Sequence, residues 1–151
     1  MMLFIGSTLF GFALLAGLSY GLHRWLFHGI LWPIHKTHHH PHKQRIEWND
    51  SFSVIFGSLS ALWFLIPHLI PLSKTWAVAC TGIGTGWTIY GVIYFVVHDV
   101  FTHRRYFRRW KTDSKWVHRL VKAHRDHHKD LSKPGAEPLG LFWVDPKKYK
   151  Y

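Results

Sequence analysis

Cysteine is almost missing from this sequence, which has Cys80 alone among 151 residues. One thiol cannot form an internal disulfide, and an iron–sulfur cluster needs several. Cys80 also lies within a long apolar stretch, where we expect no haem ligand. Glycine loops that cradle phosphate and the strained serine turn of hydrolases are absent as well. These absences exclude thiol-based redox chemistry, P-loop nucleotide binding and elbow-type serine hydrolysis.

Charged residues are missing from three long stretches of the chain. Asp, Glu, Lys and Arg do not occur from Met1 to His23, from Ser51 to Ser73 or from Thr75 to His98. At about 1.5 Å of helical rise per residue, each stretch can cross a hydrocarbon core of roughly 30 Å. We therefore predict an all-α integral membrane protein with about three to four transmembrane helices and a cytoplasmic, His-rich helical cap. Residues 1–151 are expected to form a single domain.

The expected bounds of the helices follow from these stretches and from the prolines. The first helix runs from about Leu3 to Leu22 and the second from about Phe52 to Ile66. Pro67 favours an end to the second helix, because proline cannot continue the backbone hydrogen bonding. A third helix is expected to begin near Trp76, which leaves only a tight hairpin turn between the second and the third.

The distribution of positive charge predicts the orientation in the membrane. The chain has 19 Lys and Arg residues, and all but Lys74 lie before the second or after the third predicted helix. The positive-inside rule makes that side cytoplasmic. We expect a prokaryotic inner membrane location with the active site and the C-terminus in the cytoplasm. The formal charge of +11 is then explained by topology and membrane lipid, and no nucleic-acid partner is expected.

Histidine occurs 14 times and follows a repeated order. An H-x4-H pair and then an H-x2-H-H triplet come after the first predicted helix, and the same order returns after the third. The pattern predicts ten metal ligands, which are His23, His28, His35, His38, His39, His98, His103, His124, His127 and His128. Ten imidazoles are too many for one tetrahedral zinc site, so we expect two metals with four to five histidines each.

Helical geometry predicts how the histidines are presented. Positions i, i+3 and i+4 share one face of an α-helix, so each triplet should present three imidazoles together, which can hold one metal or be shared between two. Positions i and i+5 lie about 140° apart on an α-helix. For the H-x4-H pairs two alternatives follow: the two histidines serve different metals, or the helix ends between them. Gly29 and Pro33 favour a helix end just after His28.

Carboxylates close to the ligands are expected to accept the free ring N–H of a ligand histidine. Asp99 directly follows a ligand and Asp126 lies inside a triplet, so we predict these two in the second shell. Glu47, Asp50 and Asp130 are further possibilities. Four histidines lie outside the repeat: His68 and His42 are excluded from the site, whereas His40 and His118 are possible contacts.

The choice of metal depends on the donor set. Imidazole suits Zn, Cu, Fe and Ni alike, and the Glu-x-x-His pairs of soluble di-iron bundles are absent. An all-histidine dinuclear centre at a membrane surface favours non-haem iron that activates oxygen. Zinc can replace iron in purified protein, because affinity rises through the late first-row metals.

The order of the motifs resembles that of the bacterial β-carotene hydroxylases in the fatty acid hydroxylase superfamily. The stretches that carry the resemblance are HRWLFHGILWPIHKTHHHPHKQRIEWND, YGVIYFVVHDVFTH and AHRDHH. The resemblance extends from about the first predicted helix to Pro146. Two positions depart from the family pattern: Ala16 stands where an acidic residue is common, and Glu137–Phe142 replaces a tail like VSFGFL.

The resemblance implies a membrane di-iron monooxygenase that takes electrons from ferredoxin and uses O2. Its substrate would be a lipid-soluble carotenoid, with C3 of each β-ionone ring of β-carotene hydroxylated to give β-cryptoxanthin and then zeaxanthin. The family's iron ligands fall on the same ten histidines, with no catalytic residue beyond the metal centre. Two alternatives remain open: a fatty acid or sterol hydroxylase or desaturase, and a non-catalytic zinc-binding membrane protein.

Overall fold

The computed structural model describes residues 1–40 and 45–150. These residues form helices and connecting segments without a strand, which confirms the predicted all-α class. In chain order the elements are α1 (Met2–Gly21), the π-helix η1 (Leu22–Ile30), α2 (Trp32–His39), α3 (Asp50–Leu69), α4 (Lys74–Tyr94), the π-helix η2 (Phe95–Thr102) and α5 (Lys115–Lys129).

Three continuous helical segments are long and apolar enough to cross a membrane: Met2–Ile30, Asp50–Leu69 and Lys74–Thr102. Large apolar side chains on them point away from the protein, as shown by Val54 at 67% and Leu65 at 48% exposure. Water would disfavour so much exposed apolar surface, whereas lipid covers it without cost. The chain is therefore a membrane protein, as predicted.

The second spanning helix is longer than the sequence predicted. α3 includes Pro67 and ends at Leu69, rather than stopping near Ile66. Because Pro67 lies in the last turn, its missing N–H removes one hydrogen bond only and the helix tolerates it. α4 begins at Lys74, so the expected tight hairpin between the two helices is present.

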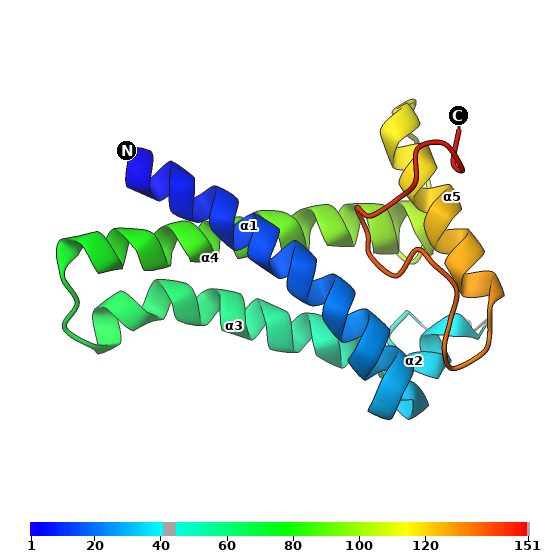
Figure 1. The fold of residues 1–151 in the computed structure, drawn as a ribbon, viewed down its shortest axis with the longest axis horizontal. Helices are drawn as coiled ribbons and strands as arrows, with labels where there is room; N and C mark the ends of the chain where they lie inside the picture. Colours follow the sequence, from blue (N-terminus) through cyan, green and yellow to red (C-terminus); the bar gives the residue numbers. More distant parts are fainter. Residues whose placement is uncertain (41–44, 151) are drawn as a thin grey trace. The chain divides into compact units, whose positions relative to one another are not determined.

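The chain divides into two compact units, and the first contains Met1–Gly17 and Ser51–Ile93. Within it, α3 and α4 run antiparallel (Figure 1). Ser60 on α3 donates a hydrogen bond to the Gly84 carbonyl at 3.3 Å and lies 3.0 Å from the Thr88 hydroxyl. Gly82 and Gly86 on α4 lie against the backbone of α1. Small residues thus allow close helix packing, as expected for membrane helices.

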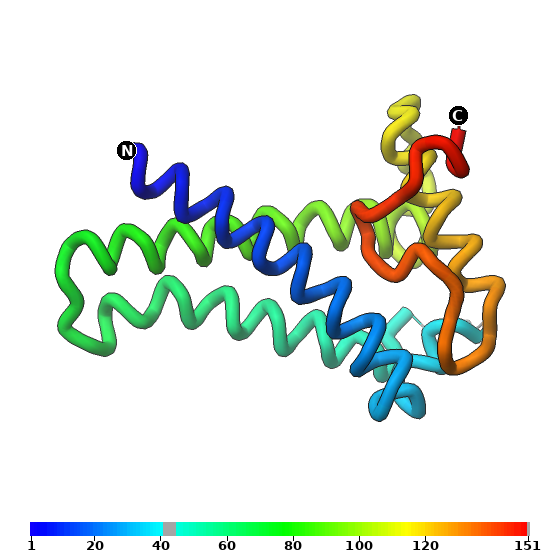
Figure 2. The backbone as a smooth tube through the Cα atoms, viewed as in Figure 1, coloured from blue at the N-terminus to red at the C-terminus, as the bar shows by residue number. Residues whose placement is uncertain are grey.

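The second unit contains Leu18–Asp50 and Tyr94–Tyr151. In it α2 packs against η1 and α5 packs against η2, so each half of the histidine repeat forms a similar helical pair. The segment after α5 runs back along that helix (Figure 2). Trp116 on α5 stacks on Phe142 at a centroid distance of 5.8 Å, and Arg119 donates to the Tyr149 carbonyl at 2.9 Å. All ten predicted ligand histidines belong to this unit.

Candidate metal centre

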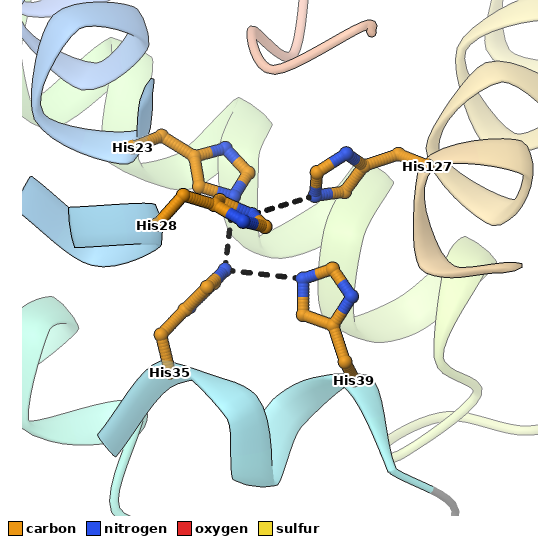
Figure 3. Close-up of side chains that lie close together, drawn as sticks. All are labelled: His23, His28, His35, His39 and His127. Atoms are coloured by element: carbon orange, nitrogen blue, oxygen red, sulfur yellow. Dashed lines mark hydrogen bonds between the residues drawn. The ribbon is translucent and has the colours of Figure 1, made fainter. Parts of the chain in front are cut away.

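The ten histidines lie in two groups of five, and within each group the ligand nitrogens are all within 4.8 Å of one another. Group A consists of His23, His28, His35, His39 and His127. Group B consists of His38, His98, His103, His124 and His128. In Figure 3 the imidazoles of group A point toward a common centre from η1, α2 and α5. Five converging nitrogens are enough to hold one metal ion per group.

The π-helices explain how the H-x4-H pairs enter one group each. In a π-helix the backbone hydrogen bonds join residues five apart, so positions i and i+5 lie on the same face. The amide of His103 donates to the His98 carbonyl at 2.9 Å, which is this five-residue bond. Both alternatives predicted for the pairs are wrong, because an α-helical turn was assumed. The chain does bend at Gly29, directly after His28, as its position suggested.

Each H-x2-H-H triplet is shared between the two groups. In α2, His35 and His39 belong to group A and His38 belongs to group B. In α5 the arrangement is reversed: His127 belongs to group A, whereas His124 and His128 belong to group B. Residues i and i+4 lie one above the other on a helix, and i+3 is turned to the side. The middle histidine of each triplet therefore reaches across to the other group.

Three imidazoles of group A are oriented by backbone carbonyls from one segment, residues 133–139. The Nδ1 atoms of His23, His28 and His127 lie 2.5, 2.8 and 2.5 Å from the carbonyl oxygens of Leu139, Lys133 and Ala136. We call residues 133–139 the carbonyl strap. A carbonyl oxygen only accepts, so each of these Nδ1 atoms carries the proton and donates it. The Nε2 atoms then present their lone pairs to the centre.

The fourth partner in group A is a side-chain amide. His35 Nδ1 lies 2.7 Å from Asn49 Oδ1, and Asn49 is buried. As an acceptor, the amide oxygen fixes the same tautomer as the carbonyl strap does. Asn49 is not one of the residues predicted from the sequence, although it lies between Glu47 and Asp50, which are two of the candidate acceptors.

Glycine is required in the carbonyl strap at one position. Gly135 has φ of +66°, and a Cβ there would lie 2.6 Å from Cε1 of His28. Only glycine adopts this backbone conformation readily and leaves room for the imidazole. Glu137 on the same segment forms an ion pair with Arg24 and lies 3.1 Å from the Tyr20 hydroxyl.

Group B is backed by carboxylates. His38 Nδ1 donates to Glu47 Oε1 at 2.8 Å, and the Glu47 side chain is only 4% exposed. Asp99, one of the two carboxylates predicted beside the ligands, lies with Oδ2 3.4 Å from His98 Nδ1. Glu47, one of the further possibilities from the sequence, makes the shorter contact.

Arg105 joins the carboxylates behind group B. Its Nη1 atom lies 2.7 Å from Asp99, 2.8 Å from Asp50 and 3.1 Å from Glu47. Burial lowers the pKa of Arg105, but the hydrogen bond to Asp50 and the nearby carboxylate charges outweigh it, so the pKa is raised. Arg105 is therefore a permanent cation that holds the three carboxylates in place.

Asp126 lies elsewhere, contrary to the sequence prediction. Its carboxylate forms an ion pair with Lys129 at 2.6 Å on the outer side of α5. Asp126 is two residues from His124 and one from His127, and on a helix this spacing turns its side chain away from the face that carries the ligands. Among the described residues it is not a member of either group.

The histidines outside the repeat are not members of either group among the described residues. His118 hydrogen-bonds to the Thr112 carbonyl at 2.7 Å, and His40 and His68 are exposed. His42 lies outside the described residues.

The contacts between imidazoles fit a bound cation. His23 Nε2 lies 2.9 Å from His35 Nε2, and His28 Nε2 lies 3.3 Å from His127 Nε2. Because Nδ1 carries the proton in all four rings, these contacts bring two lone pairs together, which is repulsive unless a cation lies between them. All-imidazole donors suit Zn, Cu, Fe and Ni. The residues present therefore fit metal ions at both groups.

The electrostatic environment keeps the imidazoles neutral. Burial lowers the pKa of His35 and of His39 to about 3, and it lowers the pKa of His127 to about 4. Burial and the neighbouring imidazoles also place the pKa of His38 and of His124 well below the usual 6.5. At neutral pH these five imidazoles are therefore neutral, and each keeps one unprotonated nitrogen that can bind a metal.

Comparisons with known proteins show which family the chain belongs to. The family model described as fatty acid hydroxylase matches residues 8–143. The β-carotene hydroxylase of Pantoea ananas is 35% identical over 144 residues, which cover 95% of this chain and 77% of that protein. The β-carotene hydroxylase of Paracoccus sp. (strain N81106 / MBIC 01143) is 33% identical over 129 residues, covering 85% and 76%.

Plant proteins are similar too. The chloroplastic β-carotene 3-hydroxylase 1 of Arabidopsis thaliana is 34% identical over 152 residues, covering 91% of this chain and 45% of the plant protein. No solved structure matches the chain.

Proposed function

We propose that this chain, which belongs to the fatty acid hydroxylase family, is a β-carotene hydroxylase that acts on C3 of the β-ionone rings. Family membership makes it an oxidoreductase, and its bacterial relatives are named for this substrate. Two successive hydroxylations would give β-cryptoxanthin and then zeaxanthin. The observation that carries the proposal is the pair of five-histidine groups in a chain so similar to those relatives.

The metal is proposed to be iron, one ion in each group, with the ten histidines as ligands. When bound, two ferrous ions supply the activation of O2 that hydroxylation requires. The protein's part is to orient the imidazoles through the carbonyl strap, Asn49 and Glu47, and to keep water away by burial. His28, His35 and His39 are at most 4% exposed, as are His38 and His98. Zinc can occupy the same donors in purified protein.

Access for a lipid-soluble substrate follows from the position of the first ligands. His23 and His98 lie within the continuous apolar segments Met2–Ile30 and Lys74–Thr102. A carotenoid dissolved in the bilayer could therefore reach the centre along these helices. We propose that residues 1–151 function as one domain, with the histidine groups and C-terminus on the cytoplasmic side of a prokaryotic inner membrane.

Electrons are proposed to come from ferredoxin, an acidic protein. Exposed basic residues follow η2, and they include Arg104, Arg108, Arg109, Lys111 and Lys115. Positive charge of this kind speeds association with an acidic partner and also binds anionic membrane lipid.

Expression in cells that accumulate β-carotene tests the substrate. Chromatography of the pigments should show β-cryptoxanthin and zeaxanthin. If iron-loaded protein is present and no hydroxylated carotenoid forms, the substrate is instead a fatty acid or a sterol. Iron absent from both groups would favour a non-catalytic zinc protein.

Substitution of one histidine per group tests the centre. His38→Ala in group B and His127→Ala in group A should each lower hydroxylation by about 100-fold or more. Loss of a residue that only orients a ligand lowers metal affinity or activity by about 10- to 100-fold, and loss of the ligand itself should cost at least as much. The readout is zeaxanthin formed per unit of membrane-inserted protein. His118→Ala on α5 is the matched control and should retain activity. Full activity in either group variant would contradict the proposal.

A further inference from the structure

Groups A and B have the same number of histidines but differ in what supports those histidines. In group A, four of the five imidazoles donate through Nδ1 to neutral oxygens. In group B, His38 Nδ1 donates to the ionised carboxylate of Glu47, and the Asp99 carboxylate lies 3.4 Å from His98 Nδ1. The pseudo-symmetry of the histidine repeat therefore does not extend to the second shell.

A carboxylate acceptor changes the ligand more than a carbonyl does. It draws the Nδ1 proton more strongly, so more negative charge develops on Nε2 and the imidazole becomes a better donor to a cation. It also places a full negative charge close to the metal. Burial strengthens both effects, since Glu47 and Asp99 are only 4% and 10% exposed.

Negative charge is concentrated behind group B. Among the described residues, the carboxylates of Glu47, Asp50 and Asp99 all contact Arg105. Two divalent ions bound by neutral imidazoles need compensating negative charge, and in the described residues this is the buried source.

Acidic residues near group A are weaker sources of charge. Asp130 and Glu137 both act on His127 electrostatically. Glu137 is 54% exposed and paired with Arg24, and the Asp130 carboxylate is solvated and accepts from the Ser132 amide. Solvent screens both charges, so group A depends mainly on neutral acceptors.

We propose that the two metal sites differ in affinity, with group B holding its metal more tightly than group A because of Glu47 and the carboxylates clustered on Arg105. This inference rests on the proposed di-metal centre and deepens it. Glu47 and Asn49 are the positioning residues that set the difference, since each acts on the metal through one histidine. Outer-shell partners of this kind are worth about 10- to 100-fold in metal affinity.

Stepwise removal of iron tests the proposal. Purified protein is loaded anaerobically with ferrous iron and titrated with a ferrous chelator, and iron per chain is measured by mass spectrometry. Two steps of about one iron each are expected, separated by at least about 10-fold in chelator concentration. In His35→Ala the step for the weakly held iron of group A should be absent. In His98→Ala the step for the tightly held iron of group B should be absent.

Two isosteric variants give opposite expectations. Glu47→Gln should move the tight step toward the weak one by about 10-fold or more, with the weak step unchanged. Asn49→Asp adds a carboxylate to His35 and should tighten the weak step, which brings the two steps together. Asn49→Asp leaves the Arg105 cluster intact, so it tests the proposal even if Glu47→Gln fails to fold.

The outcomes separate this inference from the function on which it rests. Two irons released at one chelator concentration, or a tighter group A, would overturn the inference and leave the di-metal centre standing. Failure to bind two irons under any loading condition would overturn the centre itself. An unchanged weak step in Asn49→Asp would show that the acceptor does not set affinity.

Discussion

Gly135 is the residue at which backbone and imidazole geometry are most closely linked. It needs a positive φ, and its missing Cβ leaves space for the His28 ring. A left-handed backbone costs a non-glycine residue about 1–2 kcal/mol, before any displacement of the imidazole is counted. Gly135→Ala should therefore displace His28 and lower the iron content of group A.

Iron per chain and the thermal unfolding midpoint measure this effect. Gly57→Ala on α3 is the control, since a Cβ at Gly57 meets nothing within 4 Å. Normal iron content in Gly135→Ala would mean that the carbonyl strap adjusts without moving the ring.

At the residue scale the sequence predicted the ten histidines that form the two groups, but not how they divide between the groups or which atoms orient them. Their type and spacing were sufficient, because imidazole is a specialised side chain and the motif occurs twice. Leu139 and Ala136 could not be identified, because they act through backbone carbonyls that every residue possesses. Asp99 and Asp126 were equivalent in sequence, and only the direction of each side chain from its helix separates them.

At the scale of elements, the contact between α1 and α4 depends on Gly86. A Cβ there would lie 2.2 Å from the Thr8 carbonyl oxygen and 2.6 Å from the Phe12 amide nitrogen. Overpacking of this kind costs about 1–3 kcal/mol. Gly86→Ala should therefore destabilise the fold, measured as a lower unfolding midpoint in detergent.

The matched control, Gly91, lies five residues further along the same helix. A Cβ at Gly91 would meet nothing within 4 Å, so Gly91→Ala should leave the unfolding midpoint unchanged or raise it slightly. Equal midpoints for the two variants would contradict the importance of close packing between α1 and α4.

The long helices could be predicted from the sequence, whereas η1 and η2 could not. A charge-free stretch defines a membrane helix by length alone, so the three spans were recognised with small errors at their ends. The π-helical turn leaves no compositional signal. It becomes apparent only when His98 and His103 are known to belong to one group, because the hydrogen bond from the His103 amide to the His98 carbonyl brings the two side chains to one face.

For the whole molecule, acid should release iron later than free imidazoles would. The pKa of His35 and of His39 is lowered to about 3 by burial, so protons compete for these nitrogens only in strong acid. Iron should be retained at about pH 6 and lost as the pH falls through about 4, the pKa of His127, toward about 3. The iron content after gel filtration at each pH provides the measurement.

The same shifts lower the stability of the fold in acid. An unfolded histidine has a pKa of about 6.5, so below that pH the unfolded chain binds more protons than the folded one. The stabilising contribution is complete above about pH 6.5 and falls as the pH approaches the pKa values that the histidines have in the folded state.

For the iron-release experiment, a midpoint near pH 6.5 would contradict the prediction, because it would show that the histidine groups are open to solvent.

His38 and His127 each belong to the opposite group from their triplet neighbours, and this determines when each group is completed during synthesis. Group A needs His127 and group B needs His124 and His128, all on α5, although most of group A comes from residues 23–39. Group A is complete only once His127 has been synthesised, and group B only once His128 has been. A nascent chain whose first helices are already in the membrane therefore carries neither complete histidine group until α5 is made.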